Sequence, residues 1–159
     1  MLNENYRKFV GGLLTGVGSI NNLTPYLQVG NDSDVSFDVS TWANMSSVDI
    51  IMSRGLSVIL GSGDTEPTLQ DVQLDSIINN ATPITFSMNE GTSDYVKIVS
   101  VTYKNNTTEK IIVKEIGLMV QNWAYGGTCY KRALLGRVVL DAPVVMNSGD
   151  AYTFTYAIE

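Results

Sequence analysis

The amino-acid sequence predicts a mainly β protein, an antiparallel β-sandwich or jelly-roll-like barrel with one short helix and an irregular N-terminal arm. Large apolar residues alternate with small or polar ones near the C-terminus, which is the period of a half-buried strand. Turn-forming residues recur at intervals of about ten residues, as in sandwiches and barrels. Helical periodicity is scarce. The 159 residues are a natural size for one domain with one core.

The C-terminal segment carries the clearest strand pattern. Tyr152, Phe154 and Tyr156 alternate with small or polar residues, so one face of the strand is expected to be buried. Residues 147–150, Asn-Ser-Gly-Asp, form a turn, and 143–145 form a short strand before it. These pieces together predict a hairpin.

The rest of the chain divides into two regions. Residues 1–55 are expected to form an N-terminal arm and a hairpin region, and residues 56–159 the β-sandwich domain. In the first region, 26–29 and 35–39 are expected to pair around a turn rich in Gly, Asn and Asp. Further strands are expected over 56–60, 84–88, 95–103, 111–120 and 133–140.

One helix is predicted, over residues 68–78. Thr68 follows a proline and can cap the helix, and Asp71 lies three residues on, near the positive end of the helix dipole. Leu74, Ile77 and Ile78 then fall on one face at helical spacing.

Composition and charge disfavour several classes of function. The chain is 44% hydrophobic, only 16% charged and has a net charge of −6, and its Lys and Arg residues form no run that could follow phosphates. Nucleic-acid binding is therefore not expected. One cysteine, Cys129, and no histidine exclude an intrachain disulfide and the usual structural zinc sites, so no metal or cofactor is expected. No segment reaches the length of a membrane-spanning helix, so no membrane partner is expected.

The candidate sites for chemistry have simpler explanations. Asp32, Asp34 and Asp38 suggest a calcium loop, but no Glu lies at the spacing of an EF-hand loop, which favours a solvated turn. Residues 61–64, Gly-Ser-Gly-Asp, lack the Lys-Ser/Thr of a phosphate-binding loop and are interpreted as a strand-to-helix turn. Without histidine the commonest general base is missing, so no catalytic residue is assigned and the chain is not expected to be an enzyme.

Four motifs in order resemble structural proteins of tailed-bacteriophage particles. They are Gly61-Ser62-Gly63-Asp64-Thr65-Glu66-Pro67-Thr68 with Asp71 and Leu74, Lys114-Glu115-Ile116-Gly117-Leu118, Leu135-Gly136-Arg137-Val138-Val139-Leu140, and Pro143-Val144-Val145 leading to Ser148-Gly149-Asp150 and Tyr152-Thr153-Phe154-Thr155-Tyr156.

The resemblance covers residues 56–159 and leaves the N-terminal third without a counterpart. It implies a β-sandwich that oligomerises in a collar, tail, baseplate, fibre or capsid-surface position of the virion, assembled in the host cytoplasm. The implied partners are further copies of the chain and other virion proteins, and no catalysis is implied. The chain departs from the pattern at residues 123–131, an insertion-like aromatic loop.

Two segments are candidate contact sites. Phe9, Val10, Leu13 and Leu14 belong to an apolar segment over 2–20, too poor in apolar length for a signal peptide. It is either an assembly arm that orders on docking or an ordinary first element of the domain.

The second is the aromatic loop, where Trp123, Tyr125 and Tyr130 surround two glycines. These rings either stack on a sugar or protein partner, such as a host-surface glycan, or cover the end of the core. A carbohydrate- or receptor-binding module that uses 123–130 is therefore the alternative to a structural role. An enzyme with two convergent carboxylates ranks last, because the linear spacing shows no such pair.

Overall fold

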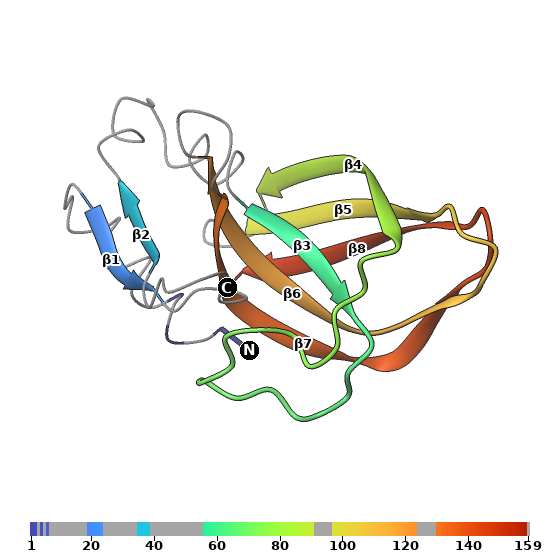
Figure 1. Ribbon diagram of the computed structural model, residues 1–159, viewed down its shortest axis with the longest axis horizontal. Coiled ribbons are helices and arrows are strands. Elements are labelled where there is room, and N and C mark those ends of the chain that lie inside the picture. The colour runs from blue at the N-terminus through green and yellow to red at the C-terminus, as the bar shows by residue number, and fades with distance from the viewer. Residues whose placement is uncertain are drawn as a thin grey trace. The chain divides into compact units, whose positions relative to one another are not determined.

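The computed structural model describes residues 1–2, 4, 6, 19–23, 35–38, 56–90, 97–123 and 130–158. Eight strands lie within these ranges (Figure 1). They are β1 (Ser19–Leu23), β2 (Val35–Asp38), β3 (Leu56–Gly61), β4 (Ala81–Glu90), β5 (Lys97–Asn105), β6 (Ile111–Trp123), β7 (Tyr130–Met146) and β8 (Ala151–Ile158). No helix in these ranges is long and apolar enough to cross a membrane.

The strands form three sheets. One has the order β3-β6-β7, a second the order β4-β5-β8, and β1 and β2 form a separate pair. The two three-stranded sheets confirm the prediction of a mainly β, antiparallel fold consistent with a sandwich.

The chain folds into two compact units, each made of segments distant in sequence. The first comprises Met1–Leu56, Thr68–Gln73 and Met119–Gly136, and the second comprises Ser57–Pro67, Leu74–Leu118 and Arg137–Glu159. The residues that make up the site described below all belong to the second unit.

The core of the second unit lies between strands of both sheets. Alternate residues of β5 and β8 are buried on one face, and apolar residues of β3 and β6 are buried as well. The Tyr103 hydroxyl, on β5, donates a hydrogen bond of 2.7 Å to the carbonyl of Val58, on β3, which ties the two sheets together. The Tyr103 ring meets Phe154 edge-on, with ring centroids 6.3 Å apart. The buried residues include Val58, Leu60, Val99, Val101, Tyr103, Val113, Phe154 and Tyr156.

The prediction of a helix over 68–78 is wrong, because this segment consists of one turn, bends and irregular chain, with an isolated bridge between Ile77 and Gly61. The predicted capping pair exists: the Thr68 N–H and hydroxyl donate to the two Asp71 carboxylate oxygens at 2.9 and 2.7 Å. That pair closes one turn only. Further along, the Ser76 carbonyl and the Ile78 N–H bond to the backbone around the end of β3 instead of to a helical turn. Local propensity is overridden by these pairings.

The predicted C-terminal hairpin is also wrong. The stretch 143–145 belongs to the 17-residue strand β7, whereas β8 pairs along its length with β5, in the other sheet. The turn 147–150 was correctly expected, with Gly149 at a φ of 86°, but it passes the chain from one sheet to the other. Alternation indicates which face of a strand is buried and cannot indicate its neighbour.

In the N-terminal region, β2 pairs with β1. Its expected partner, 26–29, lies outside the described residues.

Candidate functional site

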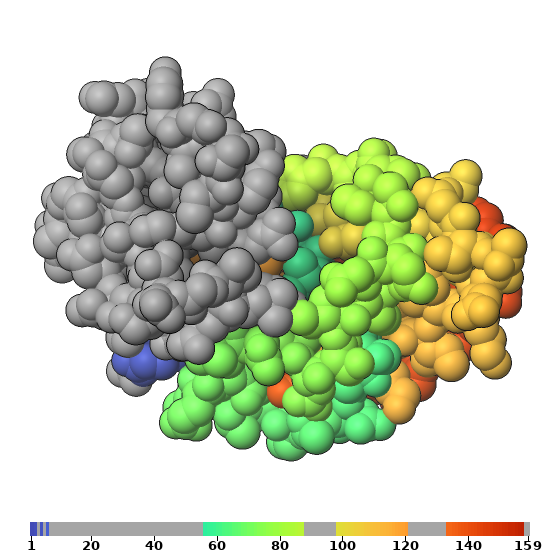
Figure 2. Space-filling view, viewed as in Figure 1, coloured from blue at the N-terminus to red at the C-terminus, as the bar shows by residue number. Residues whose placement is uncertain are grey.

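The segment between β3 and β4 folds back onto the end of β3. The Ser62 N–H donates to the Ser76 carbonyl at 2.7 Å, and the Ile78 N–H donates to the Leu60 carbonyl at 2.9 Å. We call residues 61–65 and 75–78, which these bonds bring together, the loop base. Figure 2 shows the green atoms of this part of the chain at the surface of the molecule.

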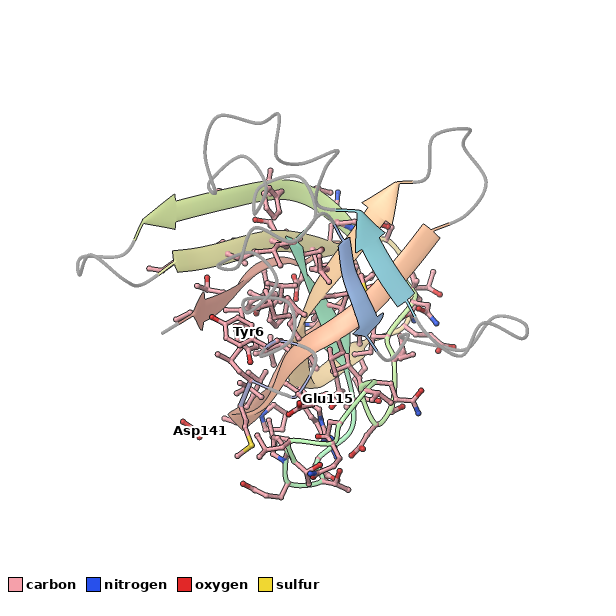
Figure 3. All side chains as sticks on the ribbon, turned by 90° about the vertical axis from the view of Figure 1, so that its left-hand side faces the viewer. Tyr6, Glu115 and Asp141 are labelled. Atoms are coloured by element: carbon pink, nitrogen blue, oxygen red, sulfur yellow. The ribbon has the colours of Figure 1, made fainter. Side chains whose placement is uncertain are left out.

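Glu115 of β6 lies directly against the loop base and is fully buried (labelled in Figure 3). Its Oε1 accepts hydrogen bonds of 3.1 Å from the backbone N–H groups of Gly63 and Ser76. Its Oε2 accepts bonds from the Asp75 N–H at 3.4 Å and from the Arg137 Nε at 2.7 Å. One carboxylate thus satisfies three backbone donors of the loop that have no strand partner, and a buried guanidinium.

Arg137 of β7 completes the cluster and is 3% exposed. Beyond its ion pair with Glu115, its Nη2 donates to the Thr65 carbonyl at 2.5 Å and the Thr65 hydroxyl at 3.1 Å. The same nitrogen lies 3.1 Å from the Asp75 carboxylate. A guanidinium is suited to this position because its several N–H donors point in fixed directions within one plane.

Thr65 and Asp75 join the two sides of the loop base. The Thr65 hydroxyl and its backbone N–H, the latter at 3.1 Å, both donate to the same Asp75 oxygen. The hydroxyl bond lowers the pKa of Asp75 below its ordinary value, against an opposing effect of burial, and the Arg137 charge lowers it further. The charged form of Asp75 is therefore the form that the loop stabilises.

Glycines let the loop base approach the carboxylates this closely. A Cβ built on Gly61 would lie 2.6 Å from Glu115 Cγ, and one built on Gly63 would lie 2.7 Å from Glu115 Oε1 and closer still to Asp75 Cβ. Real Cβ atoms essentially never come this near to other atoms. The Gly-Ser-Gly sequence is thus explained by close packing against Glu115.

The arrangement holds a loop in place and offers little to a substrate. Four donors occupy the two oxygens of Glu115, which matches the number of lone-pair sites on a carboxylate. The neighbouring ion pair between Lys114 and Asp64, 2.8 Å long, is exposed and contributes little. Among the described residues, no group of three His, Cys, Asp or Glu could hold a metal ion.

A second buried polar residue, Asn105, organises another set of turns in the unit. Its Nδ2 donates to the carbonyls of Glu109 and Met146 at 2.7 and 2.9 Å, and its Oδ1 accepts from the Thr107 N–H at 2.9 Å. Its backbone also bonds to Gly149 and Asp150. One side chain at the end of β5 therefore ties the turn before β6 to the turn before β8.

The contact sites expected from sequence lie largely outside the described residues. This holds for Phe9, Val10, Leu13, Leu14 and Tyr125. Trp123 ends β6 and Tyr130 begins β7, but their side chains also lie outside the description. Asp32, Asp34 and Cys129 are not described, and of Asp38 only the backbone is, as the last residue of β2.

The sequence reasoning missed the pairing of Glu115 with Arg137. A signal was available: Glu115 is in strand phase with Ile111 and Val113, both buried, so a charged residue stands at a core position. Arg137 likewise follows the buried Leu134 and Leu135. Charged residues at such positions are almost never buried unless they are paired, which predicts a partner without naming it.

Comparison with models of known protein families, with curated proteins and with solved structures finds no match. The resemblance to tailed-phage virion proteins therefore stays a prediction based on the quoted motifs.

Proposed function

We propose that this chain is a non-enzymatic structural component of a tailed-phage particle, which acts through subunit–subunit contacts. The supporting observation is where the motifs of the resemblance meet. The glycine-rich motif at 61–68, the Glu115 motif and the Arg137 motif come from three distant parts of the sequence and join in one hydrogen-bonded network around the buried Glu115–Arg137 pair.

The chemistry of this network favours a scaffold over a reaction site. Glu115 and Arg137 are 0% and 3% exposed, and their polar atoms bond to the loop base and to each other. The fourth motif has a similar use, since the Asp150 carboxylate accepts the Asn147 N–H at 2.8 Å and closes the turn before β8. Residues used in this way hold the surface of the unit in a fixed shape, which is what subunit contacts in an assembly require.

The test is the assembly state of the full-length chain, by light scattering and electron microscopy. We expect rings or fibres with rotational or helical symmetry. A Phe9→Ser/Leu13→Ser double variant is expected to reduce them to small species, because it replaces two apolar side chains of the expected assembly arm with polar ones. The matched control, Arg7→Ser/Lys8→Ser, changes two neighbouring residues of the same segment and leaves its apolar residues in place.

A monomer at all concentrations would contradict the proposal. If that monomer bound glycans, and if substitution of Trp123 and Tyr125 by Ala abolished the binding, the carbohydrate-binding alternative would replace the structural proposal.

A further inference from the structure

The sequence of β8 lacks the residues that usually protect an edge strand. β8 is the last strand of the β4-β5-β8 sheet, and no described strand pairs with its outer side (Figure 1). Its sequence, AYTFTYAI, contains no charged residue, no proline and no glycine. An open edge presents unpaired N–H and C=O groups to any second strand, and natural proteins block it with Lys, Pro or a bulge.

The other outer strands carry such features. β4 contains Pro83, and its register with β5 shifts between Pro83 and Thr85. β7 contains Asp141 and Pro143. β3 is only six residues long. By contrast, the pairing of β8 with β5 runs without a register shift from Ala151 to Ile158, so no bulge interrupts β8 along this length.

The outer face of the same sheet is a grid of hydroxyl groups. The hydroxyl groups form two rows across the sheet, and each row has one residue from each of the three strands. Within each row the β5 and β8 hydroxyls form a hydrogen bond, of 2.8 Å in one row and 3.0 Å in the other. The rows themselves carry no charge, and the charged residue of the neighbouring row is Lys104, opposite Ala151. In a chain with a net charge of −6, a surface without acidic groups is where two copies repel each other least. The rows are Thr85, Thr102 and Thr153, and Ser87, Ser100 and Thr155.

We propose that a second copy of this chain binds at this edge, with the two β8 strands antiparallel about a twofold axis through Phe154. This deepens the proposed function and rests on it, because it names one of the subunit contacts. The two sheets of three strands then become one continuous sheet. Such strand addition is a common mode of association, and identical strands suit a twofold axis.

The register follows from the faces of the strand. Residues opposite each other must lie on the same face, so the axis passes through a residue and not between two. With the axis at Phe154, Thr153 lies opposite Thr155 of the second copy, and each hydroxyl row continues across the junction. With the axis at Thr153 or Thr155, an alanine would face a threonine and interrupt a row.

The first test compares Thr153→Lys with Thr85→Lys in the full-length chain, by sedimentation equilibrium. Both threonines are exposed, and both lie in the same hydroxyl row, at opposite edges of the sheet. Thr153→Lys is expected to raise the dissociation constant of the β8 contact by about tenfold or more, because an edge lysine blocks strand pairing. Thr85→Lys is expected to leave it unchanged. Thr155→Lys, on the same strand, is expected to weaken the contact in the same way as Thr153→Lys. Circular dichroism of each variant checks that the loss of association does not come from a folding defect.

The second test fixes the register. In a mixture of Thr153→Lys chains with Thr155→Glu chains, the lysine of one copy faces the glutamate of the other, so mixed dimers are expected to form. The control mixture, Thr153→Lys with Thr153→Glu, carries the same charges but places them diagonally across the junction. It is therefore expected to form fewer mixed dimers. An equal or greater recovery in the control mixture would overturn the register through Phe154.

The remaining outcomes separate this inference from the proposed function. Loss of association in both Thr153→Lys and Thr85→Lys would indicate packing through the sheet face and overturn the edge contact. Symmetric assemblies that Thr153→Lys leaves intact would overturn it while the proposed function stands. A dimer sensitive to Thr153→Lys that never forms larger assemblies would support the contact and contradict the virion role.

Discussion

The loop base and the β5–β8 ladder are held by different interactions. The loop base is fixed by buried charges, with Glu115 and Arg137 bonding to backbone groups that no strand satisfies. The ladder joins β5 and β8 through backbone pairing, with Val99 and Val101 opposite Tyr156 and Phe154 on the buried face. In the first region a few polar atoms determine the backbone path, whereas in the second the strand pattern does.

The difference predicts how each region responds to substitution. A buried ion pair adds little net stability compared with an apolar pair, yet removing one partner leaves an uncompensated charge. An apolar ladder loses stability in proportion to the contacts that are removed. The loop base should therefore be intolerant of single changes, and the ladder more gradual in its response.

The largest expected effect is at Glu115. Among the described residues, Glu115→Ala leaves the buried Arg137 with only the partly exposed Asp75 carboxylate, and it leaves three backbone N–H groups without this acceptor. We therefore expect a loss of about 3–5 kcal/mol in the free energy of unfolding. Urea titration measures it. Lys114→Ala is the control, since this neighbour forms an exposed ion pair that contributes at most about 1 kcal/mol. Equal effects of the two substitutions would refute the assignment of Glu115 as the organiser of the loop.

The glycines sharpen the comparison, because two of them are required for different reasons. Gly63→Ala places a Cβ against Glu115 and Asp75, so overpacking should cost about 1–3 kcal/mol. Gly149 has open space around it and a φ of +86°. Asn tolerates positive φ better than Ala does, so Gly149→Asn should cost less than Gly149→Ala. At position 63, where space is limiting, Asn is larger than Ala and should cost more stability than Ala does. Thermal unfolding of the four variants checks this reversal, and the same order at both positions would contradict it.

A smaller effect is expected where the two sheets meet. Tyr103→Phe keeps the ring against Phe154 and removes only the hydrogen bond to the Val58 carbonyl. The expected loss is about 0.5–1.5 kcal/mol by urea titration. Phe154→Ala, which removes the partner ring itself, should cost about 3–5 kcal/mol. If Tyr103→Phe cost as much as Phe154→Ala, the gradual response expected of the ladder would be wrong.

The smallest effect is the pH dependence contributed by Asp75. Its pKa is lowered in the folded state, so its contribution to stability is present above the unfolded value of about 3.9 and is lost as the pH falls through the folded value. Thr65→Val removes the hydroxyl that contributes most to this shift, and should move the loss of stability to higher pH. Asp75→Asn should abolish this component. Unfolding followed at a series of acid pH values measures both, and identical profiles for wild type and Asp75→Asn would contradict the assignment.

Part of the candidate site was visible in the sequence before the structure. The sequence predicts a strand-to-helix turn at 61–64, where the structure has no following helix, and it predicts the capping pair of Thr68 and Asp71. The pairing of Glu115 with Arg137 was not predicted, although each stands at a core position of its strand. A strand period shows that a charge is buried, but it contains no information on which residue, 22 positions away, will neutralise it.

The sequence by itself determined the mainly β class, the turn at 147–150 and the burial of Phe154 and Tyr156 on one face of the C-terminal strand, because these depend on residues close together in the chain. Tyr152, expected on the same buried face, is 43% exposed. Only the tertiary structure decided that β8 joins β5 and not β7, and that residues 68–78 form no helix. Those outcomes depend on competition for hydrogen-bond partners between distant segments. At the loop base, the Glu115 carboxylate and the end of β3 bind backbone groups that a local helix would otherwise have used.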